Sequence, residues 1–139
     1  MTAMRSSLGQ RALDTFVDDV ARLVGSIDDE GEITARVAER LSVLLAGDFR
    51  LPAEVTRPST EHHLNYPLYI APDDSWSLAC VVWNVGQRTP VHGHETWGVA
   101  GIYAGAEREF RYVKPAASEP ARALRPAGEH VWESPGPGE

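Results

Sequence analysis

The sequence is poor in cysteine, in clustered positive charge and in long apolar runs, and each shortage excludes a class of protein. Cys80 is the only cysteine among 139 residues, which excludes a disulfide framework and a cysteine-rich zinc site. Lys and Arg number 13 against 20 Asp and Glu, and no basic run is present to neutralise phosphates, so we expect no nucleic-acid partner. No apolar run approaches the roughly 20 residues that cross a bilayer, and the amino-terminal stretch lacks the apolar centre of a secretory signal. We therefore expect a cytoplasmic protein with no membrane partner.

The first 50 residues show helical periodicity. Apolar residues recur at steps of three and four over 8–24 and again over 32–46, which predicts two amphipathic helices. Gly25 and Gly47 suit their carboxyl ends. Because a short acidic turn joins them, we expect the helices to be antiparallel and to cover one side of a sheet.

After residue 50, short β-rich runs alternate with turns. The strongest is 75–83, whose second half is apolar at every position, as in a strand covered on both faces. Cys80 lies within this run, so we expect it to be an unreactive core residue. The predicted strands are 68–71, 75–83, 90–94, 98–103, 107–113, 121–124 and 129–132. Many short strands after two helices predict one mainly β domain, a small barrel or jelly roll over 51–139 with the helical segment 1–50 packed on it.

The residues that carry chemistry are His92 and His94. On a strand, residues i and i+2 project to the same face, so both imidazoles would point the same way. Neutral imidazole suits iron, zinc, copper and nickel. By itself a His-x-His pair is a weak signal, and two structural histidines in a metal-free barrel remain an alternative.

The flanking glycines make the signal more specific. Gly86, the two histidines, Gly98 and Gly105 are spaced as in the first motif of the cupin family, which this stretch resembles. The family's acidic ligand is replaced by Gly98, which suggests a three-histidine site.

Within the cupins, Thr89-Pro90-Val91-His92, His94, Trp97 and Gly98 resemble the thiol dioxygenases, namely cysteine dioxygenase and the bacterial 3-mercaptopropionate dioxygenases. The resemblance implies a double-stranded β-helix, or jelly-roll barrel, in which three neutral histidines hold Fe(II). It also implies a non-haem iron oxidoreductase that uses O2 to convert a small thiol, 3-mercaptopropionate-like or cysteine-like, to its sulfinate. The expected substrate pocket contains Trp97, Gly98, Tyr69 and Trp83, although burial in the core is the competing interpretation of both tryptophans.

In the family, the third histidine follows a turn rich in Pro and Gly, such as 134–139, so we expect it past Glu139 in a longer protein. His130 is the weaker alternative for the third ligand. Strand edges left exposed by truncation would favour a homo-oligomer. Other functional alternatives are a non-catalytic cupin that binds a metal or small molecule, and a different cupin dioxygenase or isomerase using the same histidine pair.

Overall fold

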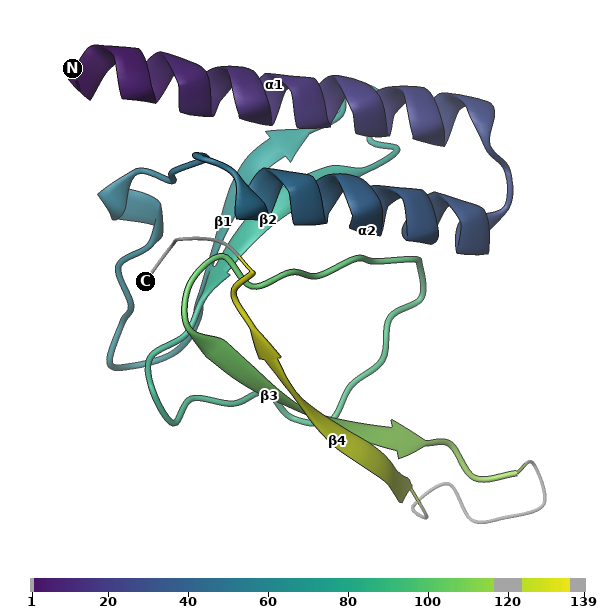
Figure 1. Ribbon diagram of the computed structural model, residues 1–139. Coiled ribbons are helices and arrows are strands. Elements are labelled where there is room, and N and C mark those ends of the chain that lie inside the picture. The colour runs from purple at the N-terminus through teal and green to yellow at the C-terminus, as the bar shows by residue number, and fades with distance from the viewer. Residues whose placement is uncertain (1, 117–123, 136–139) are drawn as a thin grey trace.

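The computed structural model describes residues 2–116 and 124–135, which form two helices followed by two antiparallel hairpins (Figure 1). The architecture is mixed α/β, and the described residues form two two-stranded sheets with no closed barrel. The elements are α1 (Thr2–Ser26), α2 (Glu30–Ala46), the short 3-10 helix η1 (Ala53–Val55), β1 (Leu64–Ile70), β2 (Ser77–Val82), β3 (Ala106–Val113) and β4 (Arg125–Glu133).

Both predicted helices are confirmed, and α1 begins earlier than expected. Asp29 caps α2, because its carboxylate accepts a 2.8 Å hydrogen bond from the Glu32 backbone N–H. The helices lie antiparallel (Figure 1), and an ion pair links them, with Arg40 Nε 3.9 Å from a carboxylate oxygen of Asp19. No helix in the described part of the chain is long and apolar enough to cross a bilayer.

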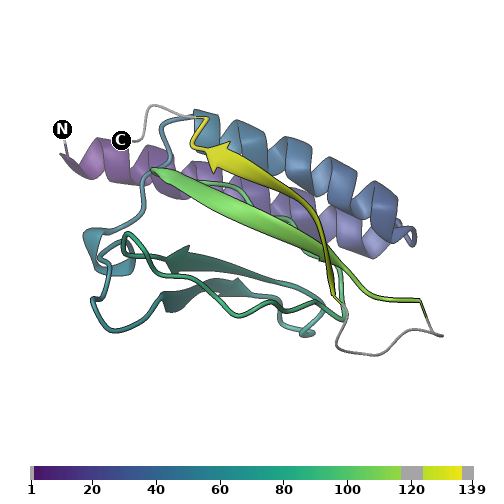
Figure 2. The ribbon, with the colours of Figure 1, turned by 90° about the horizontal axis from the view of Figure 1, so that it is seen from below.

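The hydrophobic core lies where the two helices meet. Its buried side chains are Phe16, Val20, Ile33, Val37, Leu44 and Phe49. Trp76 and Leu78 pack against this cluster, so the helices cover one side of the β1–β2 hairpin as expected. In Figure 2 the helix pair and this hairpin form separate layers. The amphipathic stripes read from the sequence therefore account for the best-packed part of the molecule.

The β1–β2 hairpin pairs Leu64 with Val82 at one end and Ile70 with Ser77 at the other, with an irregularity at Pro67. The predicted strand 75–83 is confirmed in its central part, and β1 is longer than the predicted 68–71. The tight connection includes Asp74, whose φ of 59° is left-handed. Asp73 stabilises the turn, because its carboxylate accepts bonds from the backbone N–H and the hydroxyl of Ser75.

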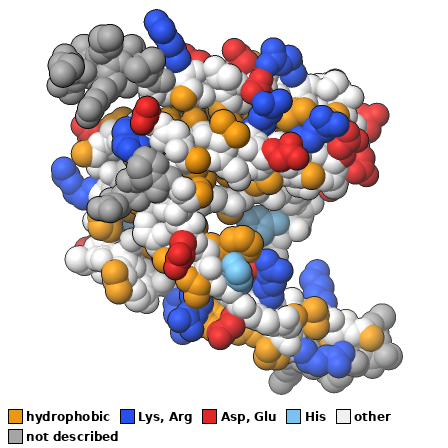
Figure 3. All heavy atoms as spheres, in the orientation of Figure 1, with side chains coloured by type: hydrophobic (Ala, Val, Ile, Leu, Met, Phe, Trp, Pro, Cys, Tyr) orange, Lys and Arg blue, Asp and Glu red, His pale blue; other side chains and the backbone are white. Residues whose placement is uncertain are grey.

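The β3–β4 hairpin projects away from the helices (Figure 1), and Figure 3 shows a hollow between the two. The predicted strands 107–113 and 129–132 are both confirmed and slightly extended. Every residue of the hairpin strands is exposed except Glu109, which is half-buried. Of the predicted strand 121–124, residues 121–123 lie outside the described residues, and Leu124 is not in a strand.

The predicted strands 90–94 and 98–103 are wrong, because both segments are irregular loop. A strand needs a neighbour to satisfy its backbone, and in the described residues each hairpin strand pairs only with its own partner. Pro90 also has no N–H to donate. The second segment instead crosses α2 so closely that a Cβ on Gly101 would lie 2.6 Å from Cδ1 of Leu45.

Candidate metal site

His92 and His94 lie in the loop between β2 and β3, and their imidazole rings are neighbours. The ring centroids are 5.3 Å apart and the planes are inclined by 44°. Both side chains are exposed, so the expectation that they project into a barrel interior from one strand is wrong for the described structure. The pair is brought together by loop conformation and a one-residue spacing instead of by a pleated strand.

The His92 ring is oriented by the backbone of its own loop. Its Nδ1 lies 2.9 Å from the carbonyl oxygen of Pro90. Because a carbonyl oxygen can only accept, the hydrogen of a neutral imidazole sits on Nδ1 and Nε2 keeps its lone pair. Metal-binding histidines commonly use this arrangement, in which the second ring nitrogen donates to a carbonyl.

The residues that follow the pair tie the loop to the helices. Trp97 and Val99 are half-buried and pack against the helical core. Further along, the Tyr103 hydroxyl accepts a 3.0 Å hydrogen bond from the backbone N–H of Leu51, and its ring meets Phe49 edge to face. The loop is therefore exposed at the histidines and anchored immediately after them.

A third metal ligand is not brought to the histidine pair by the described residues. Within 2–116 and 124–135, no group of three His, Cys, Asp or Glu side chains is placed to hold a metal ion. His130, the weaker candidate, lies on β4 opposite Glu109, with its ring against Trp132 at a centroid distance of 4.3 Å. Two imidazoles are the donor set that the described structure assembles.

The residues expected to line a substrate pocket have separate surroundings. Tyr69 packs against Trp76 and lines a pocket of about 450 Å³ next to the end of α1, to which neither Trp83 nor Trp97 contributes. Trp83 is half-buried and stacks on His63, with ring centroids 4.6 Å apart. Trp97 packs on the helical core, in agreement with its competing interpretation as a core residue.

Gly98, the fourth expected pocket residue, is exposed, and a Cβ placed there would meet nothing within 4 Å. No steric requirement for glycine is therefore visible at this position, where the cupin motif has its acidic ligand.

Cys80 is half-buried in β2, and its thiol lies 3.5 Å from the carbonyl oxygen of Val55. Burial raises the pKa of this thiol, which keeps it protonated at neutral pH. This agrees with the interpretation of Cys80 as unreactive.

Sequence reasoning missed a polar cluster on one face of the β3–β4 hairpin. Arg111 donates a 2.6 Å hydrogen bond to the carboxylate of Glu109, opposite His130 on β4. The Arg111 bond is the main cause that lowers the pKa of Glu109, and the Trp132 indole and the charge of His130 add to it. The signal available in the sequence was the alternation of Glu and Arg along β3, where side chains two residues apart share a face.

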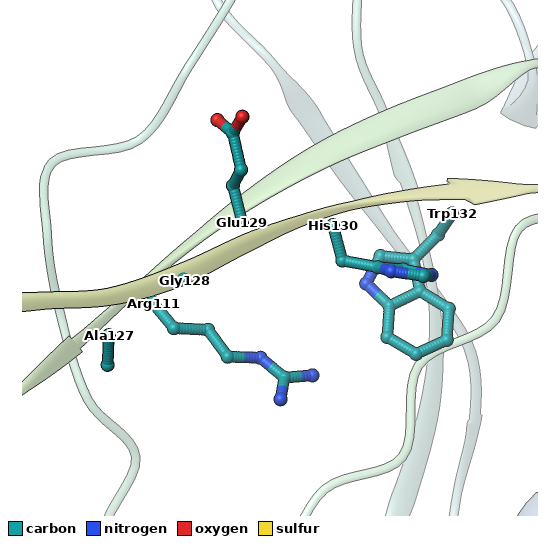
Figure 4. A pocket seen from close by; sticks show the side chains of 6 residues that line it. All are labelled: Arg111, Ala127, Gly128, Glu129, His130 and Trp132. Atoms are coloured by element: carbon teal, nitrogen blue, oxygen red, sulfur yellow. The ribbon is translucent and has the colours of Figure 1, made fainter.

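Arg111, His130 and Trp132 of this cluster border a pocket of about 370 Å³ (Figure 4). Arg111, His130 and Trp132 lie on one side of the hairpin there, whereas the Glu129 side chain points to the other side. Arg111 is already paired with Glu109, so the pocket does not present a free cation to a ligand.

No family model matches the chain. The histidine pair, its surroundings and the resemblance of its motif are therefore the features that bear on function.

Proposed function

We propose that the chain binds iron through His92 and His94 as part of a cupin-type thiol dioxygenase. In this proposal a small thiol, 3-mercaptopropionate-like or cysteine-like, takes up both atoms of O2 at sulfur and becomes a sulfinate. The two hairpins are proposed to be parts of a cupin barrel. The observation that carries the proposal is the adjacency of two imidazoles, one of which has its Nε2 lone pair free.

The ring separation fits a shared ion. Imidazole nitrogens bind zinc at about 2.0–2.1 Å, and at a similar bond length two rings on one ion have centroids on the order of 5 Å apart. The observed separation is 5.3 Å. Imidazole is also a suitable ligand for ferrous iron, and in non-haem oxygenases two histidines recur together with a third ligand, commonly a carboxylate, and open positions beside them.

Iron held by His92 and His94 would supply the redox chemistry that a reaction between a thiol and O2 requires. Other residues of the chain would position the two histidine rings. The Pro90 carbonyl holds the His92 ring in the required tautomer, and Trp97 fixes the following segment to the helical core. The exposure of both rings leaves room beside them for a substrate.

Anaerobic titration with Fe(II) tests the metal site. His92→Ala and His94→Ala should each weaken iron binding at least about 100-fold, since each removes a ligand from a site with few donors. His62→Ala is the matched control, because His62 is also exposed and its Nδ1 lies 2.9 Å from a backbone carbonyl oxygen, that of His63. Iron binding equal to wild type in both site variants would reject the proposed ligands.

A second candidate function is a non-catalytic metal-binding cupin, which is favoured by one observation. The described residues assemble two donors, both exposed, which suits reversible binding better than a permanent catalytic iron. Oxygen uptake by the iron-loaded protein with 3-mercaptopropionate, cysteine and related thiols separates the two. Consumption of one O2 for each thiol, with sulfinate as product, supports the dioxygenase. Iron binding without thiol-dependent uptake supports the alternative.

A further inference from the structure

Among the described residues, one edge of strand β3 has no neighbouring strand. In the described residues β3 pairs with β4 alone, so its other edge presents backbone N–H and C=O groups. The hairpin projects from the body of the molecule (Figure 3), and Phe110 and Tyr112 on β3 are 47% and 40% exposed. Exposed strand edges of this kind recruit further strands unless the fold blocks them.

The hydrogen-bond pattern shows which residues serve the open edge. The backbone N–H of Ser134 donates a 3.1 Å bond to the carbonyl oxygen of Gly105, just outside the hairpin strands. In an antiparallel ladder, residues alternate between those that bond to the neighbouring strand and those that face away from it. The register is regular as far as Arg111, so Glu109 bonds toward β4, whereas Arg108 and Phe110 present their backbone groups to the open edge.

The outer edge of β4 is less suited to pairing. Pro126 has no N–H, and Gly128 has a φ of 135° next to the irregularity in the register. Proline and bulges are the devices that block strand edges in natural sheets. Of the two edges of this hairpin, β3 therefore offers the more continuous one.

The charges on β3 select one register for self-pairing. When two copies pair antiparallel with Phe110 opposite Phe110, Glu109 of each copy lies opposite Arg111 of the other. These two pairs occupy the closely spaced positions of the ladder, where opposite charges attract most strongly. Arg108 lies opposite Tyr112, and no like charges are directly opposed.

The neighbouring registers are disfavoured by the same residues. Shifting by two residues preserves the hydrogen-bond alternation but places either Glu109 or Arg111 opposite its own copy, and like charges directly opposed are destabilising. Shifting by one residue places backbone groups that face β4 against groups that face outward. The charges and the hydrogen-bond pattern therefore both favour the register in which Phe110 lies opposite Phe110 of the other copy.

We propose that two copies of this chain associate through the outer edge of β3, forming a continuous four-stranded antiparallel sheet in the order β4, β3, β3 and β4. Glu109 and Arg111 already pair within each chain at 2.6 Å, and across the twofold axis at Phe110 each of them also lies opposite its counterpart of opposite charge, so the four side chains form one network. This association does not involve the histidine pair or the proposed iron chemistry, and it requires β3 to be an edge strand of the proposed barrel.

Charge exchange tests the register. In sedimentation or light-scattering experiments, the wild-type chain should show a concentration-dependent species of twice the 15.2 kDa mass of one chain. Glu109→Arg places Arg opposite Arg, and Arg111→Glu places Glu opposite Glu, so each variant alone should dimerise at least about tenfold more weakly. Mixing the two variants restores opposite charges at both pairs, and the mixture should form a heterodimer.

Two further variants separate a loss of the intermolecular charge pairs from a general effect of changing the charge of the hairpin. The double exchange Glu109→Arg with Arg111→Glu should dimerise like wild type, because both pairs are restored with reversed sign. Glu129→Arg is the matched control, since it makes the same charge change on β4, one strand away from the interface, and should leave dimerisation unchanged. A wild-type chain that stays monomeric at millimolar concentration, or single variants that fail to associate when mixed although they are folded by circular dichroism, would overturn the proposal.

Discussion

The helical half and the β3–β4 hairpin contain the same kinds of apolar side chain in opposite environments. In the helices Val20 is 1% exposed and Phe16 is 5% exposed, whereas in the hairpin Phe110 is 47% and Trp132 is 43% exposed. Hydrophobic stabilisation scales with the apolar area removed from water. The helical pair therefore carries most of the stability, and the hairpin depends on backbone pairing and on contacts between opposing side chains.

The largest difference in the free energy of unfolding is expected between alanine substitutions at two phenylalanines, one in each region. Phe16→Ala should lower the free energy of unfolding by about 3–5 kcal/mol, because it leaves a cavity in a packed core. Phe110→Ala should cost about 1 kcal/mol or less, because its ring is already nearly half in water. Chemical denaturation in dilute protein measures both. If both substitutions lowered the free energy of unfolding equally, Phe110 would have to be as well buried as Phe16, which would contradict the comparison.

A smaller effect is expected where the two regions are joined. Tyr103→Phe removes the hydroxyl that accepts the Leu51 N–H bond but keeps the ring against Phe49. The expected loss is about 1 kcal/mol, the usual range for one hydrogen bond being about 0.5–1.5 kcal/mol. Hydrogen exchange of the Leu51 amide should accelerate at the same time. An unchanged exchange rate would show that this bond does not hold the loop to the linker after α2.

The smallest effect is the pH response of the hairpin. The folded pKa of Glu109 lies below its ordinary value of 4.5, chiefly because Arg111 donates to it. A lowered folded pKa means that its contribution to stability is fully present above the unfolded pKa and is lost as pH falls through the folded one. The indole N–H resonance of Trp132 should titrate below pH 4.5, and Glu109→Gln should remove that titration. A midpoint at or above the ordinary value would contradict the Arg111 contact.

The sequence predicted the helices well and the loop around the histidines poorly, for a physical reason. An amphipathic helix satisfies its own backbone, so the period of its apolar residues is enough to locate it. A strand depends on a neighbour, and the segments 90–94 and 98–103 have strand-like composition but no neighbouring strand in the described residues. Strand 107–113 was predicted from its own alternating side chains, and it forms because its partner follows within the same hairpin.

For the candidate site, the prediction that the His92 and His94 rings are neighbours is confirmed, but the rings meet through the conformation of a loop and not on the strand from which the prediction was made. Their spacing was not sufficient to predict their exposure, which depends on how the loop crosses the helices. Trp97 illustrates the limit, because an aromatic residue beside a candidate ligand suits a pocket wall and a core contact equally well. Its packing on the helical core was decided by tertiary structure.

The close crossing of the loop over α2 also couples the position of the histidine pair to that of the helix. Gly101 lies against Leu41 and Leu45, and Trp97 is packed on the same helical surface, a few residues from the two imidazoles. A displacement of α2 along its axis would therefore move the loop that contains His92 and His94 and change the separation of their rings. Substitutions on the inner face of α2, away from the two histidines, should consequently change the affinity for the proposed iron as well as the stability of the fold.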